Sequence, residues 1–295
     1  ILARSAALTE LIGSDAAKSV ITKYGGYATT AMMLGWATGG IIFGMMSDKW
    51  GRVKTMVVTL LVYSGFTGLS GCAQSWMDFI GYRFLVGLGV GGMFGAATTL
   101  VAESVPGGFR SVALGSLQAL SATGNITGSM ISYLIPPGQA DFLSHYSGWR
   151  VLFFVGILPS LLVIPMIWFL REPDAWKKAK EAAARGEGRK NVGSPFELLR
   201  HPVWRRNSLV GLLLGLSGMA GLWGIAFFSP ELVSTALAKE PQATVDRVKS
   251  LGTALQDLGA FLGMLGFTFV ASYIARRLAF LISLILCLVS VIFVF

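Results

Sequence analysis

The feature that most constrains this chain is a succession of eight apolar runs, each long enough to cross a lipid bilayer. A helix needs about 20 mostly apolar residues to span the hydrocarbon core. Such runs occupy 28–46, 55–73, 79–102, 111–135, 149–170, 207–228, 251–271 and 278–295. Backbone polar groups in hydrocarbon must be satisfied within their own segment, so these runs predict helices. The sequence therefore predicts an all-α integral membrane protein, a bundle of about eight transmembrane helices.

The composition excludes other classes of protein. Only 13% of the 295 residues are charged and 54% are hydrophobic, and the mean hydropathy is +0.65. A soluble domain carries about 25% charged residues, and a disordered chain combines low hydrophobicity with high net charge. The net charge of +9 fits basic loops of a membrane protein rather than a nucleic-acid surface. Both cysteines lie in apolar runs, so no metal site and no cofactor are expected.

Lysine and arginine are divided unequally between the two sides of the predicted membrane. The side with 16 of them consists of loops 47–54, 103–110, 171–206 and 272–277. The opposite side carries seven, so we expect the first side to be cytoplasmic, in a plasma (inner) membrane, and residues 1–27 to lie outside. Loop 171–206 is expected to join an N-terminal bundle, 28–170, to the start of a C-terminal bundle, 207–295. A lipid-headgroup or partner site is the alternative for this loop.

A short loop after the first span carries the most specific spacing in the chain. Residues 44–54 follow the pattern G-x-x-x-D-K-x-G-R-x-K, which includes Gly44, Asp48, Gly51 and Arg52. Gly51 permits a backbone conformation that is closed to other residues. Asp48 can cap the next helix or pair with a basic group. We expect a tight turn between two spans.

The third span combines a buried charge with a stripe of small residues. Gly87, Gly91 and Gly95 recur every four residues, so one helix face is bare backbone that a neighbouring helix can approach closely. Arg83 precedes this stripe, and a charge inside a span should face water or an acidic partner. After the span, Glu103 and Arg110 end adjacent helices and are expected to form an ion pair.

These motifs resemble those of the major facilitator superfamily. The pattern at 44–54 is similar to its loop between helices two and three, and Arg83-Phe84 with the following glycines is similar to its fourth-helix pattern. The spacing of Glu103, Pro106 and Arg110 resembles an E-x-x-P-x-x-x-R element after the fourth helix of sugar-porter-like members. Weaker resemblances occur at 171–176, to an element after their sixth helix, and at 216–230, to their seventh-helix pattern.

The resemblance implies that the eight spans are helices two to nine of a twelve-helix transporter, and that the chain is truncated. It also implies alternating access, with Asp48 and its loop holding the cytoplasmic side closed. The sequence departs from the family pattern at two places, the first of which counts against a sugar substrate and the second against symmetric gating of the two halves. Leu214-Gly215 stands where sugar porters carry paired glutamines, and 272–277 lacks the acidic residue of a second loop motif.

Polar residues within the spans are the candidates for a substrate or coupling cavity. One face of 111–135 carries Gln118, Ser121, Asn125, Ser129 and Ser132, which should face protein or a cavity rather than lipid. Contact between helices and contact with substrate both remain open for this face.

Three residues of the later spans complete the candidate cavity. Trp223 lines the cavity or packs, and Gln256 can hydrogen-bond a substrate. Asp257 has three interpretations: a proton site, since a carboxylate held away from water can exchange protons near neutral pH, a substrate or cation site, or a cap at the outer end of its helix.

We therefore expect a secondary active transporter of a small polar metabolite, a sugar or an organic acid, driven by protons or Na⁺. Its partners are the lipid bilayer and a small-molecule substrate, with no nucleic acid. A membrane enzyme would need paired aspartates, H-E-x-x-H or a Ser/Lys or Ser/His pair at membrane depth, and ATP-driven transport would need G-x-x-x-x-G-K-[ST]; the sequence shows none of these patterns. The alternative is a non-transporting receptor or scaffold on a transporter fold.

Overall fold

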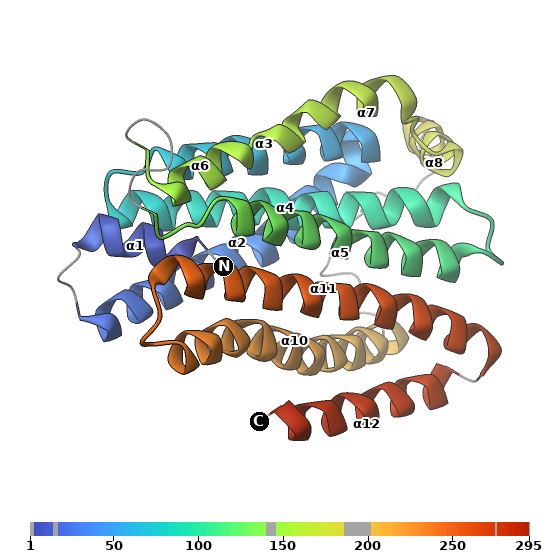
Figure 1. Cartoon of the computed structure of the whole chain (residues 1–295). Helices are drawn as coiled ribbons and strands as arrows, with labels where there is room; N and C mark the ends of the chain where they lie inside the picture. The colour runs from blue at the N-terminus through green and yellow to red at the C-terminus, as the bar shows by residue number, and fades with distance from the viewer. Residues whose placement is uncertain (1–2, 14–16, 140–145, 186–201, 275, 295) are drawn as a thin grey trace.

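The structure is a computed structural model, and it describes residues 3–13, 17–139, 146–185, 202–274 and 276–294. Its regular elements are helices, most of them side by side along one direction (Figure 1). The first five are α1 (Arg4–Ile12), α2 (Lys18–Trp50), α3 (Arg52–Gly71), α4 (Trp76–Ser104) and α5 (Arg110–Leu134). They are followed by α6 (Gly148–Val155), the 3₁₀ helix η1 (Leu158–Leu162), α7 (Val163–Phe169), α8 (Asp174–Ala184), α10 (Pro202–Ala236), α11 (Gln242–Tyr273) and α12 (Arg276–Val294).

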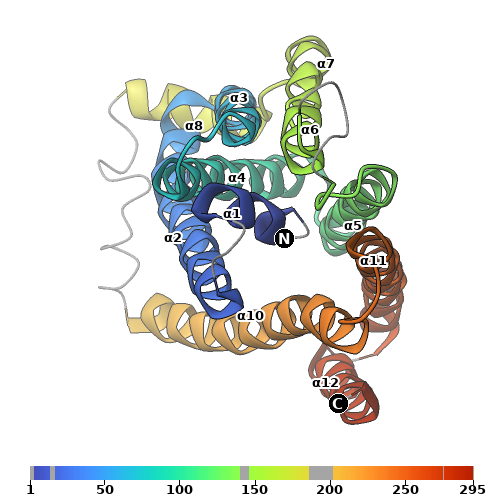
Figure 2. The same cartoon turned by 60° about the vertical axis from the view of Figure 1, so that its left-hand side comes forward.

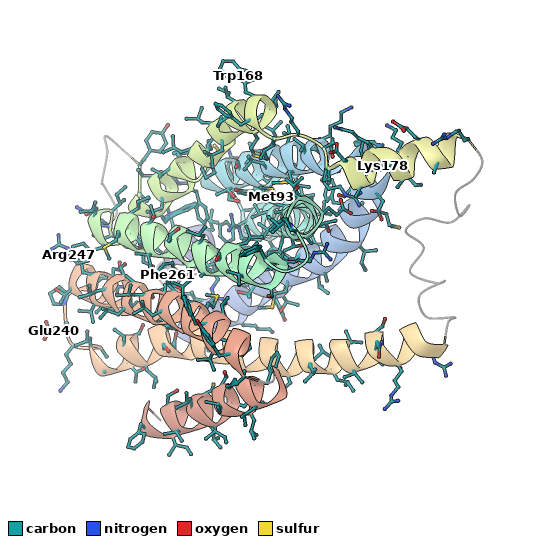
Figure 3. The ribbon with its side chains drawn as sticks, turned by 90° about the vertical axis from the view of Figure 1, so that its right-hand side faces the viewer. Met93, Trp168, Lys178, Glu240, Arg247 and Phe261 are labelled. Carbon is teal, nitrogen blue, oxygen red and sulfur yellow. The ribbon has the colours of Figure 1, made fainter. Side chains whose placement is uncertain are left out.

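Five helical segments among the described residues are long and apolar enough to cross a membrane. They are Ser19–Trp50, Arg52–Gly71, Trp76–Ser104, Gly148–Phe169 and Gln242–Ala271. Their outward side chains are often large and apolar; Trp168 is 77% exposed and projects away from the bundle (Figure 3). A large apolar surface of this kind is typical of a membrane protein, and the all-α membrane class is confirmed.

Two helices begin well before the predicted spans. α2 starts at Lys18 rather than at residue 28, and α11 starts at Gln242 rather than at residue 251. Hydropathy marks only the part of a helix that can sit in hydrocarbon, whereas its backbone hydrogen bonds continue into the more polar boundary. The early start of α11 matters for Asp257, which lies inside this helix and does not cap it.

The predicted span 149–170 is divided into α6, η1 and α7. Pro159 lies in the first turn of η1, and a proline lacks the N–H group that an uninterrupted helix would use there. The three pieces still follow one path along the bundle (Figure 1) and together form one candidate span. The span is therefore present, but it is a broken helix.

α2 and α4 cross with their backbones in close contact, and glycines make this contact possible. A Cβ atom on Gly87 would overlap the carbonyl oxygen of Met32, and one on Gly91 would overlap that of Trp36. The predicted packing role therefore holds for these two glycines. It is wrong for Gly95, because no described atom lies within 4 Å of the place a Cβ would take there.

The helices form two groups that meet where α5 packs along α11 (Figure 2). The first group holds α2, α3, α4 and the α6–α7 segment, and the second holds α10 and α12 beside α11. We call the end with the α2–α3 turn, the α4–α5 loop and α8 the α8 end. The opposite end, with α1 and the α10–α11 connection, is the α1 end. Lys178 marks the first, and Glu240 and Arg247 mark the second (Figure 3).

Glu10 of α1 ties the α1 end together. Its carboxylate accepts hydrogen bonds from the Ser147 hydroxyl, from Trp149 Nε1 at 2.7 Å and from Arg150 Nη2 at 3.1 Å. Partial burial alone would raise the pKa of Glu10, but these bonds and the positive charge of Arg150 outweigh it and lower the pKa below its ordinary value. Arg150 also donates to the carbonyl oxygen of Gly71 at 2.8 Å, so the end of α3 is held as well.

Candidate functional site

The turn between α2 and α3 is shorter than predicted. α2 continues through Gly44 and Asp48 to Trp50, so both residues are helical and the turn is made by Gly51 alone. Gly51 has φ = 117°, a conformation that glycine adopts without steric cost. A Cβ atom at this position would also overlap the carboxylate of Glu172. The positive φ is what requires glycine here, since the end of the flexible Glu172 side chain could shift away from a Cβ.

Arg52 organises the charges at the α8 end. Its guanidinium binds Glu103 with two parallel hydrogen bonds, Nη2 to Oε1 at 2.8 Å and Nε to Oε2 at 3.0 Å. Its Nη1 lies 3.0 Å from Asp48 Oδ1 and donates to the Ser47 carbonyl oxygen at 2.7 Å. Arg52 is buried, and a two-pronged arginine–carboxylate pair is among the strongest polar contacts in proteins. One side chain thus joins the ends of α2, α3 and α4.

The segment after α7 completes this arrangement. Glu172 accepts the backbone N–H of Arg52 at 2.7 Å and that of Val53 at 3.0 Å, which caps the N-terminus of α3 and places a negative charge at its positive end. Trp176 of α8 donates from Nε1 to the Asp48 carbonyl oxygen at 2.8 Å. We call Asp48, Arg52, Glu103 and Glu172 the α8-end cluster. Sequence reasoning did not assign Glu172 to it.

The predicted ion pair between Glu103 and Arg110 is wrong. Glu103 binds Arg52 instead, because the α2–α3 turn brings the Arg52 guanidinium to the end of α4. Arg110 is exposed at the start of α5 and lines an open cavity of about 380 Å³ together with Glu103, Thr98 and Thr99. The two charges therefore face one space without forming a salt bridge.

Arg83 lies within the first group of helices. Its Nη2 donates to Ser70 Oγ at 2.8 Å, and its guanidinium lies 4.6 Å from the ring centre of Phe153 and 5.3 Å from that of Phe79. Its Nε is buried without a hydrogen-bond partner among the described residues. Water or an acidic partner was expected for this charge; among the described residues Arg83 has a hydroxyl and two aromatic rings as neighbours and forms no salt bridge.

The polar face of α5 is divided between two environments. Ser129 and Ser132 are buried, and Ser132 accepts a hydrogen bond from Ser250 of α11 at 3.2 Å. Gln118 and Ser121 are exposed. Asn125 is exposed too, but its Nδ2 donates to Asp257 Oδ1 of α11 at 3.5 Å. Ser132 and Asn125 thus bond α5 to α11, whereas Gln118 and Ser121 lie on the surface.

Gln256 and Asp257 point in different directions, as neighbours on a helix do. Asp257 faces Asn125 on α5, whereas Gln256 lines a cavity of about 290 Å³ between α10 and α11. The other lining residues are Ser229, Pro230, Val233, Lys249, Gly252 and Thr253. Trp223 is on α10, but its side chain lies outside the described residues. Within the described part of the chain, no group of His, Cys, Asp and Glu could hold a metal ion.

The several long apolar helices indicate a multi-pass membrane protein, and comparison assigns the chain to a family. The family model "Major Facilitator Superfamily" matches residues 6–295, so the chain belongs to the Major Facilitator Superfamily. The relatives below are named as transporters, and the chain is a transporter-family protein rather than an enzyme.

Three curated relatives illustrate the family. The chain is 30% identical to the cis,cis-muconate transport protein of Acinetobacter baylyi over 84% of its length and 57% of that protein. It is 30% identical to a putative metabolite transport protein of Haemophilus influenzae, over 91% of the chain and 63% of the relative. It is 32% identical to the sialic acid transporter NanX of Escherichia coli, over 84% of the chain and 55% of the relative. The chain thus spans about six tenths of these relatives.

Solved structures support the fold. The proton:xylose symporter XylE bound to 6-bromo-6-deoxy-D-glucose superposes with a TM-score of 0.61 at 17% identity, over 92% of this chain and 65% of that one. XylE from E. coli in an inward open conformation gives a TM-score of 0.56 at 16% identity, over 92% and 66%. At this identity the likeness concerns the fold alone.

Proposed function

We propose that the protein transports a small organic acid by alternating access, driven by protons. The observation that carries this proposal is the meeting of Asn125 and Asp257 on α5 and α11, two mostly apolar helices that join the two groups of the bundle. Polar and ionisable groups within an apolar helix raise the free energy of the folded protein in a membrane, so they are rare there and usually mark a functional site. Transporters of this kind place substrate and coupling ions between two halves that rock against each other.

Relatives of this chain favour an organic acid over a neutral sugar. Their names include cis,cis-muconate, sialic acid, niacin, benzoate and gentisate. These compounds share a carboxylate. The chain also has Leu214-Gly215 where the sugar-porter resemblance would place glutamines. Both observations support a substrate whose carboxylate needs a cationic or hydrogen-bonding site.

Asp257 is the candidate for the coupling group. It lies six residues past residue 251, where the apolar run of this helix begins, hence about 9 Å along the axis at 1.5 Å per residue. A position inside the apolar run supports a proton site, and the contact with Asn125 would let protonation of Asp257 alter how α5 holds α11. Substrate or cation binding is the other role that the position supports.

We assign the α8-end cluster to the cytoplasmic side, in a plasma (inner) membrane. The excess of Lys and Arg in the loops of this end supports the orientation. The cluster fixes the ends of α2, α3 and α4 to the segment after α7. It would make this end of the first group move as one body, with Asp48 and the buried Arg52 in the part that closes when the cytoplasmic side is shut.

Uptake of radiolabelled benzoate, nicotinate and xylose into proteoliposomes tests the function. With an acidic outside, we expect benzoate or nicotinate to accumulate, xylose to stay at the level of protein-free liposomes, and a proton uncoupler to abolish accumulation. A Na⁺ gradient without a pH gradient should drive nothing. Accumulation of xylose alone would reject the organic-acid class. The absence of transport for all three would favour the receptor or scaffold.

A further inference from the structure

The start of α3 and the end of α7 meet at one level of the bundle, at the α8 end. Val53 and Met56 of α3 belong to a buried apolar cluster against which Met166 of α7 packs. The candidate span Arg52–Gly71 begins at this level and the candidate span Gly148–Phe169 ends there. The contact therefore marks the height at which the hydrocarbon core of a bilayer gives way to lipid headgroups.

Two large aromatic side chains project outward at this level. Trp168 and Phe169 form the end of α7 and are 77% and 78% exposed, and Trp168 points away from the bundle (Figure 3). Tryptophan is enriched where hydrocarbon meets headgroups, because its ring is mostly apolar and its N–H is polar. Both rings are therefore placed to contact lipid rather than other parts of this chain.

Two exposed cations lie beside these rings. Lys54 is in the first turn of α3, and Arg171 follows α7 by two residues. Glu172 Oε1 lies 3.4 Å from the backbone nitrogen of Lys54, so the chain at Arg171 passes close to the start of α3.

The nearest acid does not pair with either cation. The Glu172 carboxylate accepts the backbone N–H groups of Arg52 and Val53 and is thus directed at the end of α3. The side chains of Lys54 and Arg171 form no salt bridge or hydrogen bond with the described part of the chain. Two positive charges therefore face the headgroup level without an acidic partner among the described residues.

The next helix, α8, lies along the membrane surface at the same end. Figure 1 shows α8 nearly end-on while α3 and α4 are seen lengthwise, and Figure 3 shows α8 lengthwise. Because α3 and α4 are candidate spans, a helix that lies across them runs parallel to the bilayer. Trp176 fixes α8 by donating to the Asp48 carbonyl oxygen at 2.8 Å. Lys178 is exposed, and basic helices in this orientation are attracted to anionic lipids.

We propose that Lys54 and Arg171 bind the phosphate group of an anionic phospholipid whose acyl chains contact Trp168 and Phe169. Lys178 adds positive charge beside this site. Arginine and lysine both bind phosphate through charge-assisted hydrogen bonds, and the aromatic rings on the membrane side of the two cations favour a lipid over a soluble anion. The bound lipid would join the start of α3 to the end of α7, in addition to the cap made by Glu172.

The first test is native mass spectrometry of the purified protein with phosphatidylglycerol, which is anionic, and phosphatidylcholine, which has no net charge. The double variant Lys54→Gln/Arg171→Gln should bind phosphatidylglycerol about fivefold more weakly for each lost cation, which corresponds to about 1 kcal/mol each. Its binding of phosphatidylcholine should not change. The exchange Lys54→Arg/Arg171→Lys keeps both charges and should bind phosphatidylglycerol nearly as the wild-type protein does.

The matched control removes two charges from the opposite end. Lys23 and Lys239 are exposed at the α1 end, so Lys23→Gln/Lys239→Gln changes the net charge equally and should leave the affinity for phosphatidylglycerol unchanged.

Thermal unfolding in detergent gives an independent measurement. Phosphatidylglycerol should raise the melting temperature of the wild-type protein more than phosphatidylcholine does, and the double variant should lose this difference. Inorganic phosphate at the same concentration should not raise the melting temperature, because it has no acyl chains to contact Trp168. Trp168→Ala should reduce the stabilisation by phosphatidylglycerol, and its fold should be retained because the side chain is exposed.

Three results would overturn the lipid site. The first is wild-type affinity for phosphatidylglycerol in Lys54→Gln/Arg171→Gln, and the second is an equal loss in Lys23→Gln/Lys239→Gln, which would show a response to net charge alone. The third is stabilisation by inorganic phosphate equal to that by phosphatidylglycerol, which would indicate a soluble anion instead. None of these results bears on the transported substrate, because the site is independent of the proposed function.

Discussion

At the scale of single residues, Arg52 shows how one buried cation can organise an entire end of a bundle. It is paired with Asp48 and Glu103, and its own backbone N–H is held by Glu172. Each carboxylate comes from a different segment. Because the side chain is buried, removal of the cation would leave carboxylates that face one another with no compensating charge.

We expect Arg52→Ala to destabilise the folded protein by about 1–3 kcal/mol, the cost of leaving polar partners unsatisfied, because Asp48 and Glu103 are 33% and 26% exposed and water can solvate them in part. The measurement is thermal unfolding in detergent. Arg110→Ala is the control, because Arg110 is exposed and forms no salt bridge among the described residues; its effect should stay within about 0.5 kcal/mol. Equal stability of the two variants would show that the cluster contributes nothing.

A second prediction at the residue scale concerns Glu10 and the pH dependence of the protein's stability. Its folded-state pKa is lowered, so its contribution to stability is fully present above the ordinary glutamate pKa. That contribution is lost as the pH falls through the lowered folded-state value. The effect should be small because the Glu10 side chain is 42% exposed.

Melting temperatures measured from neutral pH down to below the glutamate range check this expectation. The wild-type protein should be more stable than Glu10→Gln near neutral pH, and the difference should vanish at the acidic end. A difference between the two proteins that is independent of pH would contradict the expectation.

At the scale of elements, small residues decide which helices touch. Gly87 and Gly91 of α4 meet carbonyl groups of α2, and Gly35 and Gly39 of α2 meet carbonyl groups of α4 in return. The contact is thus reciprocal and brings two backbones together, which favours packing without a large hydrophobic contribution. The G-x-x-x-G spacing of Gly35 and Gly39 is visible in the sequence, but it recurs at Gly124/Gly128, Gly211/Gly215 and Gly259/Gly263, so the spacing alone does not select α2 as the partner of α4.

Substitution of two glycines on α4 tests this contact. Gly91→Leu should force α2 and α4 apart, since the added side chain meets backbone that cannot move aside, and should cost about 3 kcal/mol or more. Gly95→Leu should be tolerated, because the space at Gly95 is open. The monodisperse fraction in size-exclusion chromatography and the melting temperature measure both. Normal behaviour of Gly91→Leu would show that the helices are less close than described.

The sequence predicted the helices far better than it predicted their contacts. Hydropathy located the apolar runs, because the cost of unpaired backbone in hydrocarbon leaves helices as the available structure. It could not give the starts of α2 and α11, since polar turns outside hydrocarbon carry no apolar signal. The partner of Glu103 was also missed: a carboxylate at a helix end can reach several cations, and only the path of the chain through Gly51 selects Arg52.

At the scale of the whole molecule, the two groups of helices contact each other along the α5–α11 interface. Gly138 N–H donates to Asp246 Oδ2 at 3.0 Å near the α1 end, and Asn125 contacts Asp257 farther along. Adjacent positions on a helix diverge by about 100°, so the sequence alone implied that Gln256 and Asp257 face different surroundings. It did not reveal which surroundings, because these depend on how α5 and α10 are placed around α11.

The last prediction uses this difference to separate coupling from binding. Asp257→Asn keeps the size of the side chain and its contact with Asn125, but it can no longer gain or lose a proton. If Asp257 is the proton site, the variant should lose pH-driven accumulation of benzoate in proteoliposomes and retain exchange of labelled for unlabelled benzoate. Asp246→Asn is the matched control on the same helix, since its amide oxygen can still accept the Gly138 N–H, and it should accumulate benzoate normally. Loss of both activities in Asp257→Asn would instead assign Asp257 to substrate or cation binding. Full accumulation would leave Asp257 only a structural part of the α5–α11 contact.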